Sequence, residues 1–327
     1  MSEYNVRLLN EPEYNQWDQL VVESEQGTIF HLSKWIAITA KFSHSDYAII
    51  GVFYGSQLIG GCSFYMKKIF YRYKIGYTNN SLTPYGGFVF SPSKSKKVRE
   101  FELKEYEIIS LILKKIKTFN LVKATLINSP ALLDIRPFLQ QGWRPRIAYT
   151  YIVPLNTDIF SMISYSARRC IRKSQKIGIT VKKEYDPDIF WKLTKLTYKK
   201  QNKKVPFQKE YLFALMEMLV RNNLGEMWIA KMPSGNAASA VFIVNDAHMA
   251  HGWVGANDPE CKRTGVVSHL LFEVFMDFQN RGFRRMNIMA GNIPHLAKFY
   301  SIFNPQLVPY YGVEKVNGIG MLINLFR

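Results

Sequence analysis

The chain has 327 residues, of which 47% are hydrophobic and 21% are charged, and it carries a formal net charge of +18. This composition excludes a disordered chain, and the length exceeds what one hydrophobic core usually serves, so we expect two domains. No apolar run reaches the length of a membrane span, and no signal peptide is recognisable at the N-terminus, so we expect a cytoplasmic protein with reduced cysteines. The positive charge favours a phosphate-bearing partner: nucleic acid, an anionic membrane surface or a nucleotide-like cofactor.

The first half of the chain contains one clear hairpin and one amphipathic helix. In residues 47–66, β-branched and aromatic side chains flank a glycine turn at 54–57, which predicts two antiparallel strands. Isoleucines at helical spacing predict a helix over residues 101–120, and the apolar run 121–127 predicts a strand after it.

The second half repeats this order of elements. Residues 227–256 predict three strands joined by short turns, residues 266–282 predict a helix, and residues 283–289 predict a strand. The repetition indicates a duplicated α+β unit, in which each copy is a mixed, mainly antiparallel sheet flanked by helices. We place the two domains at residues 1–150 and 151–327, with the boundary in a turn near 145–157.

A strongly basic helix is expected at residues 158–178, ended by Gly178. Five cations fall on one side of it: Arg168, Arg169, Arg172, Lys173 and Lys176. An apolar stripe runs along the other side: Ile159, Ile163, Ala167, Cys170 and Ser174. Like charges at i,i+4 oppose one another unless an anion lies between them. The cationic face is therefore either simply solvated or a site for an anionic partner, and we favour the second interpretation slightly.

One further segment has the features of a phosphate site. Lys262, Arg263 and Gly265 stand between a predicted strand and the start of a predicted helix, where backbone amides and the helix dipole attract anions. The spacing approximates the Q/R-x-x-G-x-G/A loop of GNAT acetyltransferases, with Val267 at the last position. The chain contains no Walker loop, no GxGxxG, no GxSxG and no CxxC, and its histidines are scattered, so we expect no metal.

The order of these features resembles the FemAB/FemX group and related BioF2-like acyltransferases, which have two GNAT folds in tandem. The resemblance is carried by IFHLSKW (29–35), by the passage from residue 142 to SYSARRCIRKSQKIGITV (164–181), by HGWVGANDP (251–259) with RRMNIMAGN (284–292), and by HLAKFYSIFNPQLVPYYGVEK (295–315). Asn287 stands where the family's D-x-x-G-like turn has aspartate, and Tyr300 stands where its F-K-x-x-F-N segment has lysine.

The resemblance implies transfer of an acyl, aminoacyl or peptidyl group to an amine. The donor would be an acyl-CoA or an aminoacyl-tRNA, and the acceptor an amine such as an amino sugar or peptide. Such a reaction requires a held donor, a stabilised oxyanion and a deprotonated amine, but neither a metal nor a nucleophilic cysteine.

The residue roles that the resemblance suggests fall into three groups. Donor phosphates would be bound by Arg168, Arg172, Lys173, Lys262, Arg263 and Gly265. Asp258 would accept the proton of the amine, although it could equally serve only to form its Asn-Asp-Pro turn, and Tyr300 would donate a hydrogen bond. The acceptor would be contacted by Tyr85, His251, Trp253 and Asn287.

An alternative function of a different class is RNA binding on a catalytically inactive GNAT scaffold, because a fold does not guarantee an activity. It predicts strong, salt-sensitive binding of RNA without transfer chemistry. The sequence does not choose between these interpretations, and it does not identify the donor, the acceptor or the oligomeric state.

Overall fold

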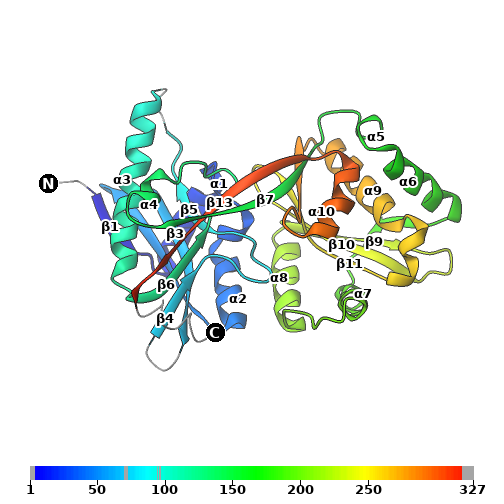
Figure 1. Ribbon diagram of the computed structural model, residues 1–327, viewed down its shortest axis with the longest axis horizontal. Helices are drawn as coiled ribbons and strands as arrows, with labels where there is room; N and C mark the ends of the chain where they lie inside the picture. The colour runs from blue at the N-terminus through cyan, green and yellow to red at the C-terminus, as the bar shows by residue number, and fades with distance from the viewer. Residues whose placement is uncertain (1–3, 70–72, 94, 96, 319–327) are drawn as a thin grey trace. The chain divides into compact units, whose positions relative to one another are not determined.

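The computed structural model describes residues 4–318 except 70–72, 94 and 96, and it divides them into two compact units (Figure 1). Unit 1 comprises Met1–Ala148 and Pro309–Arg327, and unit 2 comprises Tyr149–Val308. Two strands cross the boundary: β7 (Arg144–Pro154) carries the chain into unit 2 and β13 (Gln306–Val316) carries it back. This division differs from the predicted second domain, 151–327, at its end. The closing strand belongs to unit 1 because it pairs with β6 there.

Unit 1 is a mixed sheet with helices on both faces. Its strands follow the order β1-β2-β3-β4-β6-β13, and β5 also pairs with β3. The strands are β1 (Tyr4–Leu8), β2 (Asp46–Tyr54), β3 (Gln57–Ile69), β4 (Tyr73–Tyr77), β5 (Gly87–Phe90) and β6 (Leu121–Ile127). The helices are η1 (Glu11–Glu13), α1 (Tyr14–Glu23), η2 (Ile29–His31), α2 (Ser33–Ser43), α3 (Val98–Lys117) and α4 (Arg136–Leu139).

Periodic apolar residues explain the helix and strand that end this unit. α3 buries five residues at helical spacing, Ile108, Ile109, Ile112, Leu113 and Ile116, against the sheet. β6 alternates between buried and half-buried side chains along its whole length, as a strand packed on one face does. These two elements occupy almost the residues that the sequence predicts for them.

Unit 2 repeats this architecture, which confirms the predicted α+β class. Its strands follow the order β7-β12-β11-β10-β9-β8. The strands are β8 (Thr180–Lys183), β9 (Gly225–Lys231), β10 (Ala237–Asn245), β11 (Ala250–Asn257) and β12 (Arg285–Met289). The helices are α5 (Ile159–Met162), α6 (Tyr165–Ile177), α7 (Pro187–Lys200), α8 (Lys209–Arg221), η3 (Pro259–Thr264), α9 (Val266–Asn280), α10 (Pro294–Tyr300) and η4 (Ser301–Phe303). Figure 1 shows α6 and α9 on one face of this sheet and α7 and α8 on the other.

The basic helix predicted over residues 158–178 is two helices. The chain leaves α5 at Ile163 and turns at Ser164, whose backbone is extended (ψ 157°) and whose hydroxyl accepts a hydrogen bond from the Ala167 amide. The Ser164 amide donates to the carbonyl of Ile302, 2.9 Å away, so a distant segment fixes the break. Gly178 ends α6 in the left-handed conformation (φ 84°), as predicted.

Two parallel strands separate in each unit. In unit 2, β11 and β12 pair only at Ala250–Met286 and His251–Asn287, and beyond these pairs β11 continues alone on that side. In unit 1, β4 pairs in parallel with β6, and β5 follows β4 along the same edge of β3. Gly86, which precedes β5, forms a parallel bridge with Asn128, which follows β6. Beyond this bridge β5 and the chain after β6 part. Each unit thus has an opening at the carboxyl ends of two parallel strands.

Candidate functional site

The opening between β11 and β12 in unit 2 is bordered by η3 and the start of α9. Asp258 directly follows β11, and its carboxylate accepts a hydrogen bond from the Glu260 amide (3.0 Å), which caps η3. At the other end of η3, the Thr264 hydroxyl donates to the Cys261 carbonyl (2.6 Å) and accepts from the Val266 amide (3.3 Å). The candidate base therefore has a structural role as a helix cap.

Gly265 joins η3 to α9 in the left-handed conformation (φ 82°). A Cβ atom at this position would lie 2.2 Å from the carbonyl oxygen of Cys170 in α6. Only glycine combines that backbone angle with that approach. The sequence element that suggests a phosphate loop is thus also the place where α6 packs on the start of α9.

The exposed face of α6 is cationic. Arg169, Arg172, Lys173 and Lys176 are exposed, and within the described part of the chain no acidic side chain forms an ion pair with any of them. The Arg172 guanidinium lies 5.5 Å from the centre of the Phe160 ring, a distance suited to a cation–π contact. Lys173 lies about one helical turn after Cys170, the residue whose carbonyl packs on Gly265.

Arg168 differs from the other cations of α6. Its guanidinium donates to the carbonyls of Phe160 (3.3 Å), Ser161 (3.1 Å) and Ile163 (2.6 Å). These are the carbonyls that end α5, so Arg168 holds the break between the two helices. The structure does not place this residue among the free cations that a donor would meet.

A buried polar contact links α6 to α9. The Ser174 hydroxyl lies 3.0 Å from Nδ1 of His269, whose Nε2 lies 3.3 Å from a carboxylate oxygen of Glu273. The sequence of contacts from serine to histidine to glutamate resembles a catalytic triad. However, Ser174 is completely buried and has no access to a substrate. The contact fixes the position of the basic helix against α9, and sequence analysis missed it. A histidine and a serine on the apolar sides of two adjacent helices were the only signal.

The other border of the opening is the turn after β12. Asn287 is completely buried, and its amide oxygen accepts from the Thr150 hydroxyl (2.6 Å) and the Met289 amide (2.9 Å). Met289 and Ala290 both have positive φ angles, 58° and 60°. Consecutive non-glycine residues in this region are strained, and such strain is often found at functional sites. Asn287 thus shapes the turn and presents no surface to an acceptor.

His251 and Trp253 lie on β11 but are almost completely buried, with 1% and 8% exposure. Nε2 of His251 is 2.7 Å from Oδ2 of Asp246. Burial pushes the pKa of Asp246 upward, but the imidazole of His251 and the amides of His248 and Met249 outweigh this effect and hold the pKa at about 2.

The environment of Trp253 comes from an irregular strand pairing. Phe242 pairs with Val254 and Ile243 pairs with Gly252, so Trp253 is an extra residue in β11. Its indole packs against the Phe242 ring at 5.7 Å. Such bulges bend a strand, and this one occurs where β11 leaves β12.

Tyr300 ends α10 and packs against the hydrophobic core of unit 2. Burial raises the pKa of its phenol to about 12. The side chain therefore stays protonated at neutral pH, and it can donate a hydrogen bond but cannot act as a base.

Tyr85 belongs to unit 1 and lies in its core. It is 1% exposed, and its ring packs against those of Phe30 (5.2 Å) and Tyr310 (5.8 Å). Of the predicted site residues, Lys262, Arg263 and Gly265 immediately precede α9, and α6, which carries Lys173, packs on Gly265 through Cys170. Tyr85 is part of the core of unit 1.

Two classes of feature are not found in the structure. Among the described residues, no helix combines the length and apolar character that a membrane crossing needs. No group of three or more histidine, cysteine, aspartate or glutamate side chains that could hold a metal ion occurs in the described ranges.

The comparisons with known proteins agree with this geometry. A model of the acetyltransferase (GNAT) domain family matches residues 163–295, which contain α6, the β11–β12 opening and α9. The crystal structure of FemX superposes with a TM-score of 0.74 at 12% identity and covers 99% of this chain and 100% of that chain. The chain has a tandem GNAT fold.

Other solved structures share the tandem GNAT fold at lower similarity. L-PGS from Bacillus licheniformis superposes with a TM-score of 0.60 at 13% identity, covering 97% of this chain and 96% of that chain. A tandem GNAT protein from the clavulanic acid biosynthesis pathway gives 0.54 at 10% identity, covering 96% of this chain and 98% of that chain. No curated protein sequence matches. The predicted resemblance is confirmed for the fold.

Proposed function

We propose that this tandem GNAT protein is an acyltransferase that moves an activated acyl group from a phosphate-bearing donor to an amine. The observation that carries the proposal is the short parallel pairing of β11 and β12, which opens directly onto η3, Gly265 and the start of α9. The acetyltransferase family model covers this same region.

The donor phosphates would lie at the start of α9. The first amides of a helix lack partners within the helix, and its dipole is positive at that end. Lys262 and Arg263 are exposed on η3 immediately before it, and Lys173 is exposed on α6, the helix that packs on Gly265. Arg172 extends this cationic surface along α6. The Thr264 hydroxyl already accepts a hydrogen bond from the Val266 amide, so this amide is not open to a phosphate. The proposed site would therefore bind phosphate more through side-chain charge, and less through backbone amides, than a glycine-rich loop does.

The chemistry needs little from the protein beyond placement. The neutral amine attacks the donor carbonyl, a C–N bond forms, and the C–S bond of a thioester or the C–O bond of an aminoacyl ester breaks. One proton leaves the amine and the leaving group takes up one proton. Tyr300, which stays protonated, is suited to donate a hydrogen bond to the leaving group or the oxyanion. The second carboxylate oxygen of Asp258, or a water held by it, would accept the proton from the amine.

Acyl-CoA and aminoacyl-tRNA are the two donors that fit these cations. The structure of the tandem GNAT protein from the clavulanic acid pathway is that protein's form without AcCoA, and we extend this donor class to the present chain only as a proposal. The exposed cations along α6 would suit the longer backbone of a tRNA. The acceptor would be an amine such as an amino sugar or a peptide amine.

Thermal unfolding and a transfer assay together test this function. We expect saturating CoA, acetyl-CoA or an aminoacyl-tRNA to raise the melting temperature, because a ligand at 100 times its Kd stabilises the folded state by about 2.7 kcal/mol. The ligand that does so would then be supplied with a panel of amines, and amide formation followed by mass spectrometry. The proposal fails if neither donor class is bound or if no bound donor yields an amide.

A second candidate is RNA binding without catalysis. It is favoured by the exposed cations of α6, which have no acidic partner among the described residues. This function predicts that RNA binds with a steep salt dependence whether or not it carries an acyl group, and that no amine is modified. The same two measurements distinguish it from the acyltransferase.

A further inference from the structure

A cavity of about 560 Å³ lies in unit 1 and takes no part in the site described above. Its walls come from the end of β5, the described residues that follow it, the first turns of α3 and the loop after β6. Its volume is within the range of cavities that hold small ligands.

This cavity occupies the position in unit 1 that η3 and the start of α9 occupy in unit 2. β5 leads into α3 as β11 leads into α9, and β6 parts from β5 after the bridge between Gly86 and Asn128. Both units therefore have an opening at the carboxyl ends of two parallel strands. Ligands of α/β folds commonly bind at such ends.

The chemistry of the two openings is opposite. Unit 2 presents Lys262 and Arg263, whereas the cavity of unit 1 is lined by four carboxylates, Glu25, Glu102, Glu105 and Asp134. One cation, Lys97, also lines this cavity, and its ammonium pairs with Glu100 at 3.1 Å. In a chain with a net charge of +18, this concentration of acidic groups stands out. It disfavours a phosphate-bearing ligand.

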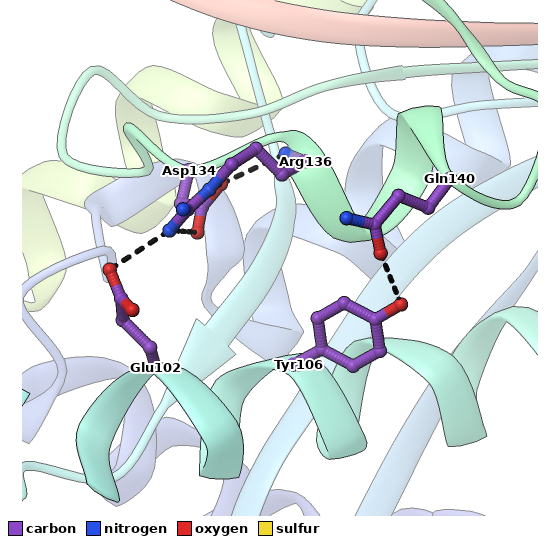
Figure 2. A network of polar contacts seen from close by, with 5 residues as sticks. All are labelled: Glu102, Tyr106, Asp134, Arg136 and Gln140. Carbon is purple, nitrogen blue, oxygen red and sulfur yellow. Dashed lines mark hydrogen bonds and ion pairs between the residues drawn. The ribbon is translucent and has the colours of Figure 1, made fainter. Parts of the chain in front are cut away.

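Two of these carboxylates, Glu102 and Asp134, share one cation. Figure 2 shows the Arg136 guanidinium between them, 2.9 Å from Glu102 and 2.7 Å from Asp134. Tyr106 donates to Gln140 beside them, which joins α3 to the end of α4. Glu25 and Glu105 form no hydrogen bond or ion pair with any described residue.

Glu105 is the unusual member of this pair. Its Oε1 atom is buried without a hydrogen-bond partner in the described part of the chain. The adjacent Lys104 instead donates to the Ser91 hydroxyl at 3.0 Å. A buried carboxylate oxygen without a donor is costly, so this position favours a ligand that brings its own donor.

The rim of the same cavity is apolar. Val98 is 71% exposed and Leu133 is 68% exposed, and both line the cavity. Large exposed aliphatic side chains beside a cavity are typical of sites that contact the apolar part of a ligand.

We propose that this cavity binds a primary ammonium group on a short apolar chain, with the ammonium at Glu105 and Glu25 and the chain against Val98 and Leu133. An ammonium supplies both the positive charge and the N–H donors that these carboxylates lack. The proposal concerns unit 1 alone, so it can hold or fail independently of acyl transfer.

The test uses the full-length protein and pentylammonium as the probe. Binding is followed by the amide NMR shifts of residues 97–105 and 131–134, with pentanoate and 1-pentanol as probes of equal chain length and different charge. We expect saturable shifts with pentylammonium and none with pentanoate. Equal shifts with pentanoate or pentanol, or no saturation with pentylammonium, would overturn the proposal.

Variants locate the charge that matters. Glu105→Gln and Glu25→Gln are each expected to raise the Kd for pentylammonium at least about tenfold, because each removes a charge-assisted contact. Glu107→Gln changes an exposed carboxylate on the same helix that does not line the cavity, and it should leave the Kd unchanged. Glu25 is exposed, so its variant keeps the test valid if Glu105→Gln does not fold. Wild-type affinity in both variants would refute the site.

Discussion

Gly265 and Cys170 bring the basic helix of unit 2 into direct contact with the start of α9. A Cβ atom on Gly265 would meet the Cys170 carbonyl oxygen at 2.2 Å, and the backbone of Gly265 is left-handed (φ 82°). The same glycine thus sets the approach of α6 and the direction in which α9 begins. The proposed donor site depends on both.

Replacing this glycine should therefore damage both the fold and the site. We expect Gly265→Ala to destabilise the protein by more than about 3 kcal/mol, because strain at positive φ and a clash add together. Gly235→Ala is the matched control, because Gly235 has nearly the same φ angle (84°) and no atom within 4 Å of the new Cβ. It should lose only about 1 kcal/mol in chemical unfolding. Similar losses in both variants would show that the contact with Cys170 is unimportant.

Arg168 and Arg169 are neighbours with different expected roles. Arg168→Ala removes three hydrogen bonds to the carbonyls that end α5, so we expect about 1–2 kcal/mol of lost stability. Arg169→Ala removes an exposed cation without an ion pair among the described residues, so stability should stay the same while binding of a polyanionic donor weakens. Urea unfolding and RNA titration of both variants measure the two effects. The assignment is wrong if Arg169→Ala is the more destabilising change.

Asp246 should make the stability of the protein depend on pH in acid. Its pKa is held at about 2 in the fold, below the ordinary value of 3.8, mainly by His251 once the opposing effect of burial is overcome. The resulting stabilisation, about 2 kcal/mol, is present above pH 4 and is lost as the pH falls toward 2. Asp246→Asn should remove this dependence, provided that unfolding is followed where the variant is still folded. An unchanged acid profile would contradict the ion pair with His251.

Glu105 should also make the stability of the protein depend on pH, but with the opposite sign to Asp246 and over a higher pH range. Burial raises the pKa of this carboxyl to about 7, aided by the charges of Asp134 and Glu25 and opposed by Lys104. The folded state then binds the proton more tightly than the unfolded state does, so stability should fall as the pH rises from about 4.5 to 7. Glu105→Gln should flatten this part of the profile, whereas Glu107→Gln should not. A carboxyl carbon NMR titration gives the pKa directly, and a value near 4.5 would refute the expectation.

Local patterns predict the repeated core of this fold well. The period of the isoleucines in α3 and the alternation in β6 depend only on neighbouring residues, and both elements form nearly where expected. The glycine and the basic residues before α9 likewise mark the start of that helix. Features of this kind are set by a few consecutive residues, so the sequence carries them.

Other features depend on contacts between distant residues and could not be predicted. Ser164 interrupts the basic helix because its amide meets the Ile302 carbonyl, and β13 returns to unit 1 because β6 offers it an edge. Tyr85 looks like an accessible loop residue, but Phe30 and Tyr310 enclose it. The break at Ser164, the pairing of β13 and the burial of Tyr85 each depend on a partner that lies far away in the chain.

The most direct test of the central claim is calorimetric titration of CoA and of tRNA into the wild-type protein and into Lys262→Ala/Arg263→Ala. Lys114→Ala/Lys117→Ala, which removes two exposed cations from α3 in unit 1, is the matched control. We predict that one of these two ligands binds the wild type and the control equally, and binds the η3 variant at least about tenfold more weakly. Equal affinity in all three proteins would contradict a donor site at the start of α9.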